Sequence, residues 1–209
     1  MPDRLEITYK IDSKVNLNFD MRKAMRRAGR YMVSSTQRKI TKTPFTPIAP
    51  LTQELRAGSK GRPLRDTGAL MSSITFRVNG ESVIIGTNRR GARINNYGGT
   101  ITAKNKSGCL WIPASREVKL YLQSQGGSIA RLLRLYRNGG YSLFRAGNAF
   151  FVRKKGKGNE KIMLFILKKS IKIPARNFFY ISDDDDKVLR RMLHVIERND
   201  GSGQTDPEG

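Results

Sequence analysis

The sequence predicts an α+β fold, in which a mixed or antiparallel sheet of hairpins packs against a long N-terminal helix and a C-terminal helix. Short runs of strand-forming residues between turn residues predict the hairpins, and apolar residues at helical spacing in 20–40 and 187–197 predict the two helices. We expect a single domain over residues 1–198 and a disordered polar tail over residues 199–209. Residues 115–161 form either an inserted arm of this domain or part of its main sheet.

The N-terminal elements follow from two different periodicities. Residues 5–11 place apolar side chains at every second position, which is typical of a strand with one buried face. The helix over residues 20–40 is expected to be capped by Asn18 or Asp20, whose side chains can accept a hydrogen bond from an unpaired N–H. Its apolar stripe, which we expect in the core, consists of Met21, Met25, Ala28 and Met32.

The most definite local prediction is a short helix followed by a hairpin. Asp66 or Thr67 is expected to cap a helix over residues 68–73, after which the apolar spacing changes from helical to alternating. Asn79-Gly80 separates two runs of strand-forming residues, and the tight turn that favours this pair has both central residues at positive φ. We therefore predict a helix, a strand, a tight turn and a second strand, in this order.

The second half of the chain is expected to contribute further strands and helices. Residues 100–103 are expected to pair with residues 109–112, and residues 115–137 are expected to be helical with a break at Gly126-Gly127. A second hairpin is expected to turn at residues 146–148. Two more strands are expected, at residues 162–167 and 171–173.

The strongly basic composition says more about partners than about the fold. Lys and Arg together number 40 against 17 Asp and Glu, which gives a net charge of +23. Self-repulsion on this scale destabilises a compact monomer unless an anionic partner neutralises it. A polyanion or an acidic protein surface is therefore the expected kind of partner.

We single out nine arginines as a candidate polyanion-binding or docking face. Four of them occupy one side of the predicted N-terminal helix, and no acid four residues away balances this row. The row is either a solvated helix face or a face that binds a polyanion. The full set is Arg22, Arg26, Arg27, Arg30, Arg89, Arg90, Arg131, Arg134 and Arg137.

The inventory of reactive side chains indicates a protein without a catalytic site. His194 is the only histidine and Cys109 the only cysteine, so the sequence excludes a Cys/His metal cluster and an internal disulfide. Neither a nucleophile-elbow motif nor a phosphate-binding glycine loop occurs. Four acids at residues 183–186 suit a helix N-terminus and lack the spacing of a calcium loop. We expect no enzyme activity, no metal and no cofactor.

Three stretches in a fixed order carry a resemblance to a known family. Residues 63–74 and 85–87 are similar to its pattern L-x-D-T-G-x-L-x-x-S-I followed by G-T. Residues 95–101 stand where the family usually reads H-x-F-G-G-x-I, with Asn95 in place of the common histidine, and residues 173–179 are similar to I-P-A-R-x-F. The chain thereby resembles the tailed-phage virion morphogenesis proteins, the tail-completion or neck proteins of Mu-like prophages and their relatives. The matching residues are Asp66, Thr67, Gly68, Leu70, Ser73, Gly86, Gly98, Gly99, Pro174, Arg176 and Phe178.

The resemblance implies a structural protein of a tailed phage or prophage that acts in tail completion or head–tail joining. Its implied partners are phage neck or tail proteins in a ring assembly, with contact to packaged DNA as a further option. It implies assembly in the host cytoplasm and then a place in the virion, at the head–tail junction or in the tail.

An alternative function and the relation to membranes follow from the residues themselves. Composition alone allows a free-standing basic nucleic-acid-binding protein, although no helix-turn-helix, zinc-finger, RRM or KH signature occurs. No apolar run approaches the ~20 residues of a membrane span, and the N-terminus lacks the apolar segment of a signal peptide. We therefore expect no membrane partner.

Overall fold

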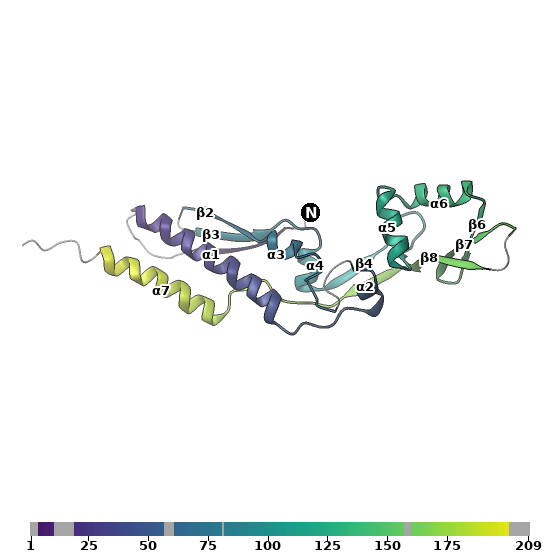
Figure 1. Cartoon of the computed structure of the whole chain (residues 1–209). Helices are drawn as coiled ribbons and strands as arrows, with labels where there is room; N and C mark the ends of the chain where they lie inside the picture. The colour runs from purple at the N-terminus through teal and green to yellow at the C-terminus, as the bar shows by residue number, and fades with distance from the viewer. Residues whose placement is uncertain (1–3, 11–18, 57–60, 81, 157–159, 201–209) are drawn as a thin grey trace, which may run out of the picture. The chain divides into compact units, whose positions relative to one another are not determined.

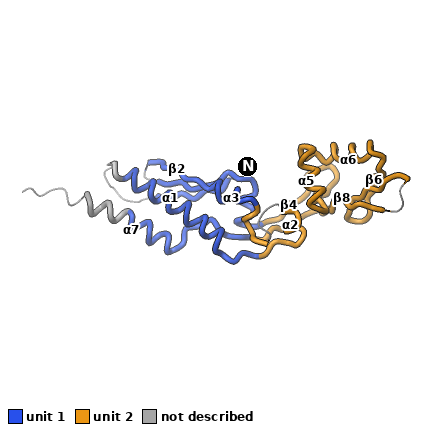
Figure 2. Tube along the Cα trace, viewed as in Figure 1, with its two compact units in different colours: residues 1–46, 67–98, 175–209 blue, residues 47–66, 99–174 orange. Residues whose placement is uncertain are grey.

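The computed structural model describes residues 4–10, 19–56, 61–80, 82–156 and 160–200 (Figure 1). It is an α+β structure with antiparallel sheets, a long N-terminal helix and a C-terminal helix, which confirms the predicted fold class. The chain divides into two compact units, shown in blue and orange in Figure 2. Unit 1 combines residues 1–46, 67–98 and 175–209, and unit 2 combines residues 47–66 and 99–174. The segment expected as an arm or sheet element, 115–161, lies within unit 2, and the single domain over 1–198 stays a prediction.

Unit 1 is a three-stranded antiparallel sheet with one long helix packed on it. The strand order is β1-β3-β2, and α1 contacts both β2 and β3. The buried side of α1 carries the predicted apolar stripe: Met25 is 0% exposed and Met32 is 2% exposed. The elements of unit 1 are β1 (Leu5–Lys10), α1 (Phe19–Lys42), α3 (Ala69–Ser72), β2 (Thr75–Asn79), β3 (Ser82–Thr87), α4 (Ala92–Tyr97) and α7 (Asp183–Asp200).

Two glycines allow the layers and strands of unit 1 to approach closely. A Cβ on Gly29 of α1 would lie less than 3 Å from ring atoms of Phe76, so this glycine admits the β2 side chain against the helix backbone. A Cβ on Gly86 of β3 would lie 2.8 Å from the Cγ atom of Glu6 and 2.9 Å from the carbonyl oxygen of Leu5. Gly86 therefore leaves room for the neighbouring strand β1, which pairs with it.

The structure confirms the first hairpin and corrects its turn. Asn79 pairs with Ser82, so Asn79 belongs to the strand ladder and is not a central residue of the turn. Only Gly80 of the predicted pair has positive φ, at 55°, because Asn79 is still a residue of the strand. The pattern located the turn correctly and misplaced its centre by one residue, since the ladder extends through Asn79.

The predicted caps of two helices are the other corrections in unit 1. The N-cap of α3 is Gly68, at φ 75°, and no side chain caps it, so neither Asp66 nor Thr67 has the expected role. The left-handed backbone at Gly68 turns the chain into the helix without a side-chain acceptor. Asp20 lies inside α1, which begins at Phe19, and Asn18 lies outside the described residues.

Unit 2 contains a four-stranded antiparallel sheet, a two-stranded sheet and three helices among its described residues. The strand orders are β5-β8-β7-β6 and β4-β9. The predicted break at Gly126-Gly127 separates α5 from α6, and the second hairpin turns at Gly147-Asn148, as expected. The elements are α2 (Pro50–Glu54), β4 (Gly99–Thr102), β5 (Leu110–Pro113), α5 (Arg116–Ser124), α6 (Ile129–Asn138), β6 (Tyr141–Ala146), β7 (Ala149–Lys154), β8 (Lys161–Lys168) and β9 (Ser170–Ile173).

The predicted pairing of residues 100–103 with 109–112 is wrong. β4 pairs with β9 and β5 pairs with β8, so both segments lie antiparallel to residues 161–173. Residues 104–108 therefore connect strands of two different sheets. Short sequence separation favoured the local hairpin, but the two segments pair with β9 and β8, which lie far along the chain from both of them.

The core of unit 2 lies between the four-stranded sheet and its helices. Leu132 of α6, Val152 of β7 and Leu164 of β8 are each 0% exposed within one hydrophobic cluster. Trp111 packs against this cluster, with its ring centroid 4.9 Å from that of Phe150. The sheet face towards α5 and α6 is therefore the buried one.

Candidate docking surfaces and the family-motif cluster

The four arginines of the N-terminal helix form an exposed row on α1. Arg22, Arg26, Arg27 and Arg30 are all exposed, on the side away from the buried methionines. None of them forms an ion pair with a described residue. The row is thus accessible to an anionic partner, and whether it binds one stays a prediction.

The remaining five candidate arginines are exposed as well, but they do not all belong to the same unit. Arg89 and Arg90 lie between β3 and α4 in unit 1. Arg131, Arg134 and Arg137 lie on α6 in unit 2. The nine candidates therefore form two sets, six residues in unit 1 and three in unit 2.

The excess of positive charge is concentrated in unit 2. Its sequence contains 20 of the 40 Lys and Arg residues but only 4 of the 17 Asp and Glu residues. Unit 1 contains the other 20 bases and 13 acids, so its net charge is about half that of unit 2. Because charge density governs attraction to anions, unit 2 is the stronger electrostatic attractor of the two.

The first family motif is held together by its hydroxyl side chains. The hydroxyl groups of Ser73 and Thr87 lie 2.8 Å apart, which joins the end of α3 to the end of β3. The same Thr87 hydroxyl oxygen accepts a hydrogen bond from the Arg89 backbone N–H at 3.1 Å. Leu70 is half-buried and Thr67 is exposed. This motif therefore fixes the backbone on both sides of the hairpin and presents no reactive group.

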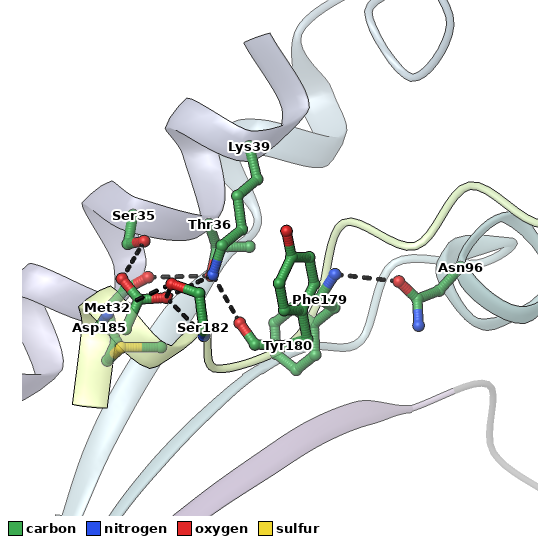
Figure 3. Close-up of polar contacts among 9 residues, drawn as sticks. All are labelled: Met32, Ser35, Thr36, Lys39, Asn96, Phe179, Tyr180, Ser182 and Asp185. Carbon is green, nitrogen blue, oxygen red and sulfur yellow. Dashed lines mark hydrogen bonds and ion pairs between the residues drawn. The ribbon is translucent and has the colours of Figure 1, made fainter. Parts of the chain in front are cut away.

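The second and third family motifs meet in unit 1. The Arg176 backbone N–H donates to the Asn95 carbonyl oxygen at 2.9 Å, and the Arg176 Nε donates to the Thr46 carbonyl oxygen at 3.0 Å. The Asn96 Oδ1 accepts hydrogen bonds from the backbone N–H groups of Phe178 at 2.9 Å and Phe179 at 3.0 Å, the second of which is drawn in Figure 3. Arg176 is 6% exposed and Phe178 is 0% exposed, so both act inside the fold.

The two adjacent asparagines of the second motif make different contacts. The Asn95 Nδ2 donates to the Gly91 carbonyl oxygen at 2.7 Å near the start of α4. The fully buried asparagine that joins distant segments is its neighbour Asn96. A six-residue helix at this position gives no periodicity from which the inward residue could be chosen.

A buried ion pair, not identified from the sequence, anchors the start of α7 to α1. The Lys39 Nζ lies 2.5 Å from the Asp185 Oδ2 (Figure 3). The Ser35 hydroxyl donates to the Asp185 Oδ1 at 2.5 Å, and the Ser182 hydroxyl donates to the Asp185 Oδ2 at 2.8 Å. Burial raises the pKa of Asp185, but the donors Lys39, Ser35 and Ser182 outweigh it and hold that pKa well below its usual range.

The sequence contained a signal for this contact. Ser182 followed three residues later by Asp185 has the spacing of a capping box, and the Asp185 N–H indeed donates to the Ser182 hydroxyl oxygen at 3.2 Å. The four acids at 183–186 were assigned to the helix dipole as a group. The structure separates them, because Asp185 is 2% exposed while Asp183 and Asp184 are exposed.

Each of the three family motifs also contains a point where the chain passes between the units. The passages fall at residues 66–67, 98–99 and 174–175, and the fourth falls at 46–47 in the proline-rich connector. Gly98 and Gly99 both have positive φ at their passage, at 71° and 147°. The motifs therefore contain the connections of the two units in addition to the contacts inside unit 1.

The described residues contain no group of three or more His, Cys, Asp or Glu side chains that could hold a metal ion. Within the same ranges, no helix has the length and apolar character needed to cross a membrane. The structure thus describes a basic α+β protein whose family-motif residues join segments to one another and whose nine candidate arginines face solvent.

Comparison with known families identifies this class of protein. Residues 6–121 match the phage virion morphogenesis family, which is more than half of the chain. The chain belongs to that family and has a structural or assembly role in a phage virion. No curated protein and no solved structure gave a match. The matched range includes the first two motifs, whereas the residues after 121, including β6–β9 and α7, lie beyond it.

Proposed function

We propose that this protein acts in tail completion or head–tail joining, by docking to an oligomeric neck or tail complex through its basic surfaces. Family membership supports a role in virion assembly, and the charge of unit 2 supports docking to an acidic surface. The observation that carries the proposal is that unit 2 holds half of the bases and fewer than a quarter of the acids. The protein acts by binding and not by catalysis.

Charge also supplies an order of assembly. A free chain with a net charge of +23 repels other copies of itself, so it remains dispersed until an acidic surface neutralises it. Docking on a ring of neck or tail proteins offsets this repulsion and brings several copies together. The protein is then incorporated at the head–tail junction or in the tail, after assembly in the host cytoplasm.

A free-standing nucleic-acid-binding protein is the second candidate, and the net charge favours it. A gel-shift titration of the purified chain with duplex DNA over a salt series separates the two functions. Each phosphate contact adds about 0.9 to the slope of log affinity against log salt, so a DNA-binding protein shows tight binding with a steep slope. We expect weak binding by the isolated chain, together with docking to tails or neck complexes in electron micrographs. Tight binding to DNA without any docking would support the second candidate.

A further inference from the structure

Among the described residues of unit 2, α5 and α6 pack on the same face of the four-stranded sheet. Val118 of α5 and Leu132 of α6 pack in the same cluster as Val152, Leu164 and Leu167 of the sheet. That face is the core of the unit, and both α5 and α6 lie on it. The opposite face of the sheet carries neither of these two helices.

The strand register defines which residues lie on the opposite face. Phe144 pairs with Phe151, and Phe151 pairs with Met163. Directly paired residues share a face and consecutive residues alternate, so these three lie opposite to the buried Val152. The adjacent row on the same face runs across all four strands. It includes Ile166, because the register shift between Phe150 and Phe151 brings Ile166 to the same face as Met163. We call both rows together the apolar band, and it consists of Phe144, Phe151, Met163, Ala146, Ala149, Ile166 and Ile112.

The apolar band is incompletely covered within the described part of the chain. Phe144 and Phe151 stack on each other, with ring centroids 5.6 Å apart and an interplanar angle of 16°, yet both are only half-buried. Met163 is 40% exposed. An antiparallel sheet with one face in water places polar residues on that face, whereas β8 places Met163 and Ile166 on the face away from α5 and α6. The sequence of β8 therefore suits a sheet with a second cover.

Cations border the apolar band at both ends. Arg153 and Lys161 pair with each other in the next row on the same face, and Lys168 lies two residues beyond Ile166. All three are exposed. Residues 99–174 contain 16 Lys and Arg residues but only two acids, Glu117 and Glu160, neither of which is a member of the band or of its cationic ends. A surface that complements this face has an apolar centre and carboxylates at its ends.

We propose that the apolar band binds another virion protein, whose contact surface is apolar in the middle and carries Asp and Glu at the rim. This inference rests on the proposed role in assembly and names the surface and the chemistry of the partner. A second copy of this chain fits poorly, because it would bring like charges together at Arg153, Lys161 and Lys168. Single-stranded nucleic acid fits less well, because the two rings of the band, Phe144 and Phe151, already stack on each other and its other members offer no ring on which bases stack.

Cysteine footprinting tests whether the apolar band is covered in the particle. Cys109 is the only cysteine and is buried, so C109A gives a background for single-cysteine variants of the full chain. M163C places a thiol in the band, and L120C places one on α5 in the same unit, where the native side chain is 50% exposed. Each variant is supplied to a phage that lacks the gene, so that particles form with the variant protein. A maleimide reagent is then used to label the thiol in the free protein and in the purified particles.

We expect the labelling rate of M163C to fall about tenfold or more in particles, because the centre of an interface excludes solvent. L120C is expected to react at similar rates in both states. Equal reactivity of M163C in free protein and particles would overturn the proposal, and so would equal protection of both thiols. If the protein were absent from particles and from assembly intermediates, the proposed function itself would be wrong, and this inference, which rests on it, would be wrong too.

A benzophenone maleimide attached to M163C identifies the occupant in the same particles. The expected product is an adduct with another virion protein, at a peptide that contains Asp or Glu beside apolar residues. An adduct with a second copy of this chain, or with DNA, would contradict the proposal. The charged ends are tested by R153E/K161E, which we expect to lower the plaque titre while R153K/K161R retains it.

Discussion

At the scale of single residues, Asp185 connects the C-terminal segment to the N-terminal helix. Its two carboxylate oxygens accept from Lys39, Ser35 and Ser182, and the side chain of Asp185 is 3% exposed. A buried charge is stable only when opposite charge and hydrogen bonds replace its water. Lys39 in turn donates to the Tyr180 carbonyl oxygen at 2.6 Å, so one lysine ties both Tyr180 and α7 to α1.

Asp185→Asn is expected to lower the free energy of unfolding by about 3 kcal/mol, because removing one member of a buried ion pair leaves the Lys39 charge uncompensated. Urea denaturation followed by circular dichroism measures the change. The matched control is Asp184→Asn, since the side chain of Asp184 is 92% exposed and its loss is expected to cost about 0.5 kcal/mol or less. Equal stabilities of the two variants would show that the buried pair contributes nothing net.

The same carboxylate predicts a dependence of stability on pH. The pKa of Asp185 is lowered in the folded protein, so the folded state binds this proton less readily than the unfolded chain does. Its contribution is complete above the unfolded pKa of about 3.9 and is lost progressively as the pH falls towards the folded pKa. Between about pH 5 and pH 2 the wild type is expected to lose more stability than Asp185→Asn. Parallel curves for the two proteins would contradict this assignment.

At the scale of elements, the hairpin of β2 and β3 depends on the backbone of Gly80. Its φ is 55°, and nothing lies within 4 Å of a Cβ placed there, so only the backbone conformation restricts substitution. Gly80→Val is expected to lower Tm by several degrees, because a β-branched residue resists positive φ and ~1 kcal/mol corresponds to about 2–4 °C at this chain length. Gly80→Asn is the control, because asparagine tolerates this conformation better. An unchanged Tm for the valine variant would show that the turn is not strained by a side chain.

The exposed arginine row of α1 makes a prediction about assembly. Arg22, Arg26 and Arg30 face solvent and form no ion pair with a described residue, so the triple replacement by Glu is expected to leave Tm nearly unchanged. Docking to an acidic surface is expected to weaken by about 100-fold or more, because like charges brought together cost several kcal/mol. The plaque titre of a complemented null phage measures the effect, and the triple replacement by Lys keeps the charge as a control. Full titre with the Glu variant would identify the row as a solvated helix face.

Elements with a clear local period could be predicted, and those that depend on distant partners could not. The spacing of Met25 and Met32 predicted the buried side of α1, and glycine-containing turns located both hairpins. The partner of residues 100–103 was predicted wrongly, because pairing with β9 depends on a segment about 70 residues away in the chain. Asn96 escaped prediction for the same reason, since it is defined by what it contacts across the fold. The cap of α7 at Asp185 could have been found from its spacing to Ser182, but its ion pair with Lys39 spans 146 residues of the chain.

At the scale of the whole molecule, the two units differ in their net charge and in how much of their sequence matches the family. Unit 1 contains the buried contacts of the family motifs, at Ser73, Asn96 and Arg176. Unit 2 contains most of the net charge and the apolar band. The family match ends at residue 121, within α5, so most of the sheet that carries the apolar band lies in the unmatched part of the chain. We expect the surfaces of unit 2 to determine which partner this particular chain recognises.

Co-sedimentation of the purified chain with tails from a phage that lacks its gene tests the central claim, at increasing salt and beside naked DNA. We predict saturable association with tails at low salt that weakens as the charges are screened, and weaker association with DNA at the same salt. Association with DNA alone, with no binding to tails or to the assembled neck at any salt, would contradict the account.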